Sequence, residues 1–384
     1  MNSKLLFLFV FLTVIVNACV DRYYPEIDKY NDTLAIDGLI TTDPGPYFIK
    51  LQLASTIYHP VLNPLSNAEV SVADDLGNIE FFEETEPGVY SSTSPDFRGI
   101  AGRSYQLTVT LSENNIYQSS WEKISAPLGI DSVYAELENH IDPNVPYSLS
   151  GYQFYVDTKE ASTDTTFLLW RLQSTYKYNS DYKCWHVYVG KIELFPKPDS
   201  LFTCWKTEMV PEIIVGTTKS SYGNQLKRYP LHYVSGEGRE LTLRYSVLVN
   251  QLVVSGTVYN YWKSIRDQNE IQGTLYTQQP YQIRGNIVNI NNPEEPVIGC
   301  FTAAGIAKKR VYYNSPDIDY NYEICIVHEA DYENMRNLRG SSPTEWPIYL
   351  SMDENHIKFY PEQRCIDCRE RGGQLEKPDF WIDN

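Results

Sequence analysis

The chain has 384 residues, and its 49 acidic residues outnumber its 32 Lys and Arg residues, which gives a net charge of −17. A surface this acidic repels phosphate backbones and anionic membrane surfaces, which argues against nucleic-acid binding and against membrane attachment through basic residues. A hydrophobic content of 42% is enough to build packed cores, so a chain that is disordered throughout is excluded.

The chain begins with one lysine, Lys4, followed by an uninterrupted apolar run from Leu5 to Val16. This run is shorter than the roughly 20 residues that a membrane-spanning helix needs. A positive residue, an apolar segment and a small residue such as Ala18 before the cleavage point are typical of a secretory signal peptide. We therefore predict a signal peptide over residues 1–18.

The residue after the predicted cleavage point is a cysteine. Val16-Asn17-Ala18-Cys19 is similar to the bacterial lipobox, in which the cysteine receives a diacylglycerol and a further acyl chain. Several chains anchor a protein stably, because each buried CH₂ contributes roughly 0.8 kcal/mol. We expect lipidation at Cys19 and a lipidated tether over residues 19–31. Because no acidic residue directly follows Cys19, we expect the outer membrane, on its periplasmic or its surface-exposed face.

From residue 34 onwards, short alternating segments are separated by turn residues. Asp43–Pro46 separates the first two segments, and Asp74–Asn78 has the composition of a hairpin loop, with Gly77 or Asn78 able to adopt a positive φ. Strands that recur at spacings of about ten residues are typical of a β-sandwich. We predict an immunoglobulin-like β-sandwich over residues 32–125 and a linker over residues 126–133.

The rest of the chain, residues 134–384, is predicted to form a larger β-rich domain with one amphipathic helix. Residues 152–158 and 166–178 have the pattern of two strands, which we interpret as a hairpin. The helix is expected over Gly256–Gln268, with Ser255 as its N-cap and an apolar face that packs on a sheet. The predicted fold class is therefore mainly β.

Six cysteines follow Cys19, and an even number in an exported chain fits disulfide pairing. The disulfide candidates are Cys184, Cys204, Cys300, Cys325, Cys365 and Cys368.

Two of these cysteines suggest a specific bridge. Cys184 and Cys204 each precede a tryptophan in an expected strand, so a bridge between them is preferred. Cys365 and Cys368 form a C-x-x-C motif, for which structural bridging is favoured over a zinc site that includes His356 and over a redox role.

The sequence contains no nucleophile elbow, zinc-protease motif, phosphate loop or dinucleotide fingerprint. We therefore expect no enzyme, no cofactor and no bound metal. The 31 tyrosines against 14 phenylalanines indicate many rings at wet boundaries, either as a binding surface or, as we favour, on half-exposed sheets.

The C-terminal segment "CIDCRERGGQLEKPDFW", together with "PYQIRGNIVNINNPEEPVIGC", "YNYWKSIRDQ" and "LAIDGLITTDPGP", resembles the Bacteroidota outer-membrane lipoproteins of domain-of-unknown-function family 4249. Cys300 stands where an aromatic residue often stands in that family, which leaves its partner open, with Cys325 as one candidate. The resemblance implies an accessory role beside a TonB-dependent receptor, and it supplies no catalytic residues.

These features favour a non-enzymatic accessory or ligand-capture protein whose ligand is a small molecule, a peptide or a glycan. The alternatives are a structural or adhesive surface protein and an exported hydrolase. At the end of the chain, Phe380 and Trp381 belong either to a terminal strand that docks on the core or to a segment that contacts a partner.

Overall fold

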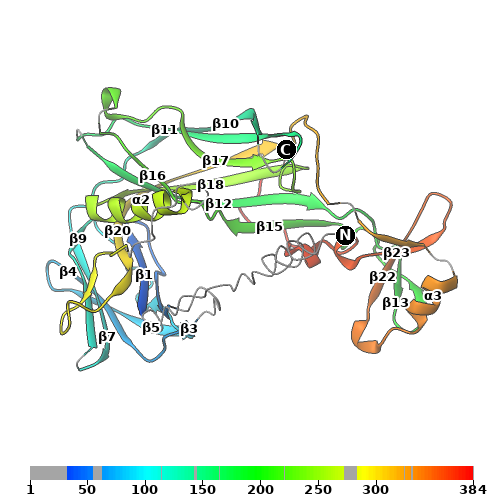
Figure 1. Ribbon diagram of the computed structural model, residues 1–384, viewed down its shortest axis with the longest axis horizontal. Coiled ribbons are helices and arrows are strands. Elements are labelled where there is room, and N and C mark those ends of the chain that lie inside the picture. The colour runs from blue at the N-terminus through cyan, green and yellow to red at the C-terminus, as the bar shows by residue number, and fades with distance from the viewer. Residues whose placement is uncertain are drawn as a thin grey trace, which may run out of the picture.

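The computed structural model describes residues 33–54, 63–113, 115–141, 145–163, 165–219, 221–271, 283–323, 325–329 and 332–383. The fold is mainly β, as predicted, and consists of two β-rich bodies and a small lobe (Figure 1). The predicted signal peptide, the lipidation site Cys19 and the tether of residues 19–31 lie outside the described residues.

The first body is built from short strands that follow one another along the chain. Its strands are β1 (Leu34–Thr41), β2 (Phe48–Leu53), β3 (Asn63–Pro64), β4 (Glu69–Asp74), β5 (Ile79–Glu86), β6 (Val89–Ser92), β7 (Ser104–Ser112), β8 (Asn115–Ser119) and β9 (Glu122–Lys123). Alternate side chains along these strands are buried, and they pack into one core. The expected β-sandwich fits this arrangement, whereas its immunoglobulin-like detail stays a prediction.

The hairpin between β4 and β5 lies where the sequence predicts it. The Asp74 carboxylate accepts hydrogen bonds from the backbone N–H groups of Leu76 and Asn78, both at 2.9 Å. Gly77 has a φ of +86°, a conformation that a residue without a Cβ adopts easily.

The strand β20 (Val297–Asn314) belongs to both bodies. Its first part, up to Ala304, pairs in parallel with β1, and its second part, from Gly305, pairs antiparallel with β18 (Arg244–Val254). At Gly305 the segment that joins the two bodies crosses β20 so closely that a Cβ would lie 2.2 Å from the Ser125 carbonyl oxygen. This position therefore requires glycine.

The boundaries expected at residues 125 and 133 do not coincide with breaks in the sheets. The strand β10 (Ile130–Ile141) begins inside the range expected to be a linker. The strand β19 (Ile287–Asn289), from far along the chain, pairs with β8 and adds Ile287 to the core of the first body.

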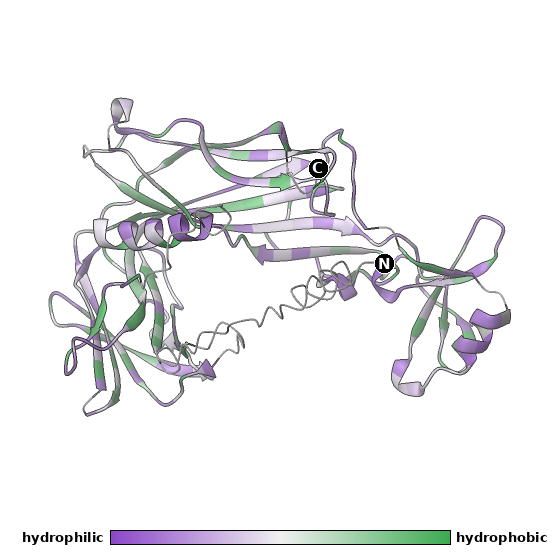
Figure 2. Cartoon of the chain, in the orientation of Figure 1, coloured by the Kyte–Doolittle hydropathy of each residue, from purple (hydrophilic) through white to green (hydrophobic). Residues whose placement is uncertain are grey.

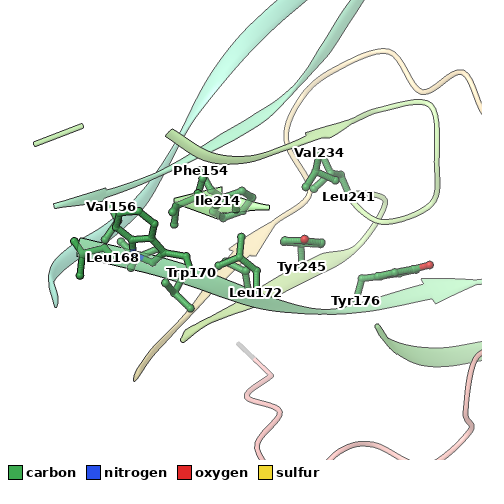
Figure 3. Packing of buried hydrophobic residues seen from close by; sticks show 14 of the residues in the cluster. Phe154, Val156, Leu168, Trp170, Leu172, Tyr176, Ile214, Val234, Leu241 and Tyr245 are labelled. Carbon is green, nitrogen blue, oxygen red and sulfur yellow. The ribbon is translucent and has the colours of Figure 1, made fainter. Parts of the chain in front are cut away.

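The second body is a sandwich of two sheets. One sheet contains β12 (Phe167–Asn179), β15 (Thr203–Met209), β16 (Ile214–Thr217), β18 and the second part of β20, and the other contains β10, β11 (Ser148–Thr158) and β17 (Tyr229–Ser235). Figure 3 shows their shared core, in which Leu168, Trp170 and Leu172 follow one another along β12 before Tyr176 at its edge. The core changes from aliphatic to tyrosine-rich towards this edge.

The hairpin predicted from residues 152–158 and 166–178 is wrong, although both segments are strands. β11 pairs with β10 and β17, whereas β12 pairs with β15, β16 and β18. The connection between β11 and β12 crosses from one sheet of the sandwich to the other, because both strands bury one face in the shared core.

The predicted amphipathic helix is confirmed as α2 (Gly256–Ile271). The Ser255 hydroxyl caps it by accepting a hydrogen bond of 3.3 Å from the Val258 N–H. Val258 is fully buried, and Trp262 and Ile265 pack on the face of the large sheet that the second sheet leaves uncovered. Among the described residues, no helix is both long and apolar enough to cross a membrane.

The small lobe, on the right of Figure 1, was not predicted as a separate unit. Its elements are β13 (His186–Tyr188), β14 (Ile192–Leu194), β21 (Val327–Glu329), α3 (Tyr332–Arg339), β22 (Ile348–Met352) and β23 (Lys358–Pro361). Over the described chain as a whole, short 3₁₀ turns lie at Tyr222–Asn224, Pro343–Glu345, Gln363–Cys365 and Cys368–Arg371. The helix α3 is short and its hydropathy is low along most of its length (Figure 2), so its apolar signal in the sequence is weak.

The C-terminal segment docks on the same face of the large sheet as α2, but without forming a strand. Trp381 is 4% exposed, and its ring meets Tyr312 of β20 edge to face at 5.8 Å. Phe380 is 39% exposed and lies beneath the Arg310 guanidinium, 3.8 Å from its ring centre. Docking is therefore confirmed for Trp381, whereas Phe380 keeps part of its ring in solvent.

We expect the substitution Trp381→Ala to lower the free energy of unfolding by about 3–5 kcal/mol, because it removes a buried ring and leaves a cavity over β20. Phe380→Ala serves as the matched control and should cost clearly less, since that ring is partly exposed. Denaturant unfolding of both variants measures the difference. Equal losses for the two variants would contradict the docking of Trp381.

Candidate functional site

The disulfides differ from the predicted pairing. Cys204 of β15 is bonded to Cys368, across a sequence separation of 164 residues, and Cys325 is bonded to Cys365. The preferred bridge between Cys184 and Cys204 is therefore wrong. Strand pattern alone did not identify a partner that comes from the far end of the chain.

The two remaining thiols are buried. Cys184 packs with Leu201 and Ile366 inside the lobe, and Cys300 packs beneath α2, so neither meets Cys325 as a partner. Burial raises the pKa of both thiols to about 12. Both cysteines therefore act as small apolar side chains near neutral pH.

The C-x-x-C motif is used for structural bridging, as favoured from the sequence, with its two cysteines in two different bridges. This arrangement excludes the zinc site proposed with His356, which is exposed. Among the described residues, Cys325, Cys365 and Asp181 have their sulfur and oxygen atoms within 4.8 Å of one another, but the two sulfurs already form a disulfide. The bond between Cys204 and Cys368 fastens the C-terminal part of the chain to β15 of the large sheet, and the bond between Cys325 and Cys365 joins the segments before β21 and after β23 at the base of the lobe.

Two cavities lie beside this fastened junction, and the loop of residues 236–243 between β17 and β18 borders both. One cavity, of about 630 Å³, is the acidic chamber, bordered by Glu208, Glu237, Glu240 and Tyr245. The other, of about 420 Å³, is the arginine chamber. It shares Glu237 and Glu240 with the first and is also bordered by Tyr176. Together they are the candidate functional site.

The guanidinium groups of the arginine chamber are already engaged. Arg239 donates two hydrogen bonds to Asp181, at 2.7 and 2.8 Å, and Arg364 donates two to Glu323, at the same distances. Arg371 donates to the Arg364 carbonyl oxygen at 2.9 Å, and burial together with the nearby Arg239 lowers its pKa. These arginines therefore hold the walls together.

The loop of residues 236–243 is fixed at several points. The Arg239 guanidinium stacks on the Tyr322 ring at 4.3 Å in addition to its pairing with Asp181. Leu241 is buried in the core of the second body, and its carbonyl oxygen accepts a hydrogen bond of 2.9 Å from the Tyr320 hydroxyl. The loop thus presents its two glutamates from a rigid base.

The floor of the site is formed by Tyr176 of β12 and Tyr245 of β18, which are direct neighbours in the register of the large sheet. Burial raises the pKa of both phenols, and the nearby Glu240 raises them further. Figure 3 shows both rings at the tyrosine-rich edge of the core, with Tyr245 near Leu241. Both rings stay protonated near neutral pH and offer a hydroxyl as well as an aromatic surface.

A larger cavity, of about 800 Å³, lies where the two bodies meet, along Ser125–Gly129 and the loop from Lys159 to Thr166. It is lined mostly by small and hydroxyl side chains. None of the buried side-chain polar atoms without a hydrogen bond in the described part of the chain belongs to it. It therefore offers less specific chemistry than the candidate site.

The sequence did not single out Tyr176, Tyr245 or Glu240. The excess of tyrosine over phenylalanine was the only signal, and it indicated wet boundaries without saying which rings occupy them. The C-x-x-C segment, which the sequence did single out, forms part of the junction beside the arginine chamber through Arg364 and Arg371.

A family model described as a domain of unknown function (DUF4249) matches residues 20–310. No curated protein matches the chain. Among solved structures, the crystal structure of a DUF4785 family protein from Legionella pneumophila is similar over 59% of this chain and 54% of its own length, with 10% identity and a TM-score of 0.19. The chain thus matches about half of that protein, and a likeness this distant carries no argument.

We expect peptide mapping without reduction to recover two linked pairs, Cys204 with Cys368 and Cys325 with Cys365. The thiols of Cys184 and Cys300 should react with an alkylating agent only after denaturation, because they are buried. A peptide that joins Cys184 to Cys204 would contradict this connectivity.

We expect stability to fall above pH 10, the ordinary pKa of tyrosine, because the folded state keeps the protons of Tyr176 and Tyr245 that the unfolded state releases. A raised pKa in the folded state contributes stability below the unfolded pKa and loses it as the pH rises. Replacing both tyrosines by phenylalanine should therefore flatten the alkaline decline in unfolding free energy. An equally steep decline in this double variant would refute the assignment.

Proposed function

Because the chain belongs to the DUF4249 family, whose shared domain has no known function, we propose its role from the features of the chain itself. It is a lipid-anchored protein of the outer membrane that captures a ligand without transforming it, as an accessory partner of a TonB-dependent receptor. The observation that carries this proposal is the tyrosine-floored site at the end of the large sheet, beside a junction that two disulfides stabilise.

The disulfides support an exported location, because such bonds persist in oxidising compartments and are rare in the cytosol. Closing the loop between Cys204 and Cys368 contributes on the order of 4–5 kcal/mol in the chain-entropy model. A binding site on so rigid a base loses little conformational entropy when it takes up a ligand.

The carboxyl groups support a binding role over a hydrolase. Wherever a carboxyl pKa in the described residues departs clearly from its ordinary value, it is lowered. For Glu212, burial raises the pKa, but the contact with His232 and a backbone hydrogen bond together lower it further than burial raises it. A general acid needs a carboxyl whose pKa is raised towards the working pH.

An adhesive surface protein is the second candidate, favoured by one observation. Two apolar side chains of β10 are exposed, Leu137 by 53% and Ile141, at the end of the strand, by 87%. Exposed apolar side chains suit contact with another surface.

We expect a radioactive fatty acid to label the protein in cells and a Cys19→Ser variant to lose both the label and its place in the membrane fraction. In the same cells, crosslinking should co-purify an outer-membrane barrel receptor with the wild-type protein. An unlabelled protein that still fractionates with membranes would contradict the anchor. Loss of adhesion with unchanged nutrient uptake after deletion of the gene would favour the adhesive role.

A further inference from the structure

We propose that the acidic chamber binds the ammonium group of an organic amine, so that the captured ligand carries a primary amine. This inference rests on the proposed capture function and names the chemical class of its ligand. Three features of the chamber support it: the charges that border it, one buried hydroxyl and the spacing of its carboxylates.

The charge of the chamber is unbalanced. Among the described residues, three glutamates border it and no Lys or Arg does, and His232, which also borders it, is paired with Glu212 at 3.2 Å. Glu208 is paired with Lys206 at 2.9 Å, and Glu237 accepts a hydrogen bond of 3.1 Å from the Tyr147 hydroxyl. Glu240 has no cationic partner in the described part of the chain. An ammonium group would supply the missing positive charge.

The position of Glu240 is built into its loop. Gly238 leaves the space that the carboxylate occupies, since a Cβ there would lie 1.8 Å from Glu240 Oε2. The neighbouring Arg239 is turned to the arginine chamber, where Asp181 holds it. The arginine closest in sequence therefore does not neutralise Glu240.

A second, independent observation is the Tyr245 hydroxyl. The Tyr245 side chain is 1% exposed, and it borders the chamber. Ser174 lies near it, but no hydrogen bond of ordinary geometry joins the hydroxyl to a described residue. Leaving a buried hydroxyl unsatisfied costs free energy, and a donor in the chamber would satisfy its oxygen as an acceptor and lower that cost. An ammonium group carries three such donors.

The spacing of the carboxylates favours an organic cation over a metal ion. Calcium takes six to eight oxygen ligands at 2.3–2.6 Å, which requires carboxylates that converge. The three chamber glutamates are not among the groups of described residues whose ligand atoms lie within 4.8 Å of one another. Separate carboxylates beside aromatic rings suit an ammonium group on a carbon chain. A volume of about 630 Å³ has room for that chain.

The test is calorimetric titration of the full-length protein with cadaverine, a diamine, and with pentanediol, its neutral counterpart. Cadaverine should bind and pentanediol should not. Glu240→Gln should weaken cadaverine binding roughly tenfold, because it removes the charge and keeps the shape. Tyr245→Phe should weaken it to a smaller extent.

The matched control is Glu113→Gln, which removes the same charge from an exposed turn in the first body. Equal weakening in Glu240→Gln and Glu113→Gln would overturn the inference, since the amine would then respond only to net charge. Binding of calcium with displacement of cadaverine would overturn it as well. A wild-type protein that co-purifies with a receptor but binds no cadaverine would refute the amine and leave the capture function standing.

Discussion

The arrangement of this protein depends on the backbone pairing of β20, which is shared by two sheets. Its first eight residues pair with β1 and the remainder with β18, so the hydrogen bonds of a single strand orient both bodies. The same strand contributes Phe301 to the first core and packs Tyr313 against the second. Since a strand is stiff over this length, the two bodies are coupled by more than the covalent link near Gly305.

The outer face of the large sheet is covered by two segments that are far apart in the chain. Near the first body α2 covers this face, and near the lobe the C-terminal segment covers it with Trp381. That segment is held in place by the bond between Cys368 and Cys204. The opposite side of the same sheet end carries the candidate site, so the bridge that fixes the end of the chain also fixes the walls of the chambers.

The two chambers of the candidate site differ in whether their charged side chains are neutralised within the protein. In the arginine chamber, Arg239 and Arg364 are neutralised by carboxylates of the protein. In the acidic chamber, Glu240 keeps an unbalanced charge next to rings whose hydroxyls stay protonated. Charged pairs that are satisfied internally stabilise structure, whereas an unbalanced charge in a concave site is available to a ligand.

Local sequence patterns were sufficient to predict the elements whose structure depends on interactions between nearby residues. The turn at Asp43–Pro46, the hairpin at Asp74–Asn78 and the capped helix after Ser255 all depend on residues only a few positions apart. The hydrogen bonds and side-chain periodicities of these elements involve residues that are close in sequence, so a short stretch is enough to predict them. The helix α3 was not predicted because it is only 8 residues long and mostly hydrophilic, so its few apolar residues give a weak signal.

Taken alone, the sequence determined the mainly β fold, the family and the positions of the disulfide candidates, because composition and periodicity are properties of neighbouring residues. The tertiary structure decided which sheet each strand joins, which cysteines pair and which tyrosines meet at the chambers. The partner of Cys204 lies 164 residues away, and Tyr176 and Tyr245 become neighbours only through sheet register. Such contacts depend on how whole sheets pack, which no short stretch of the chain encodes by itself.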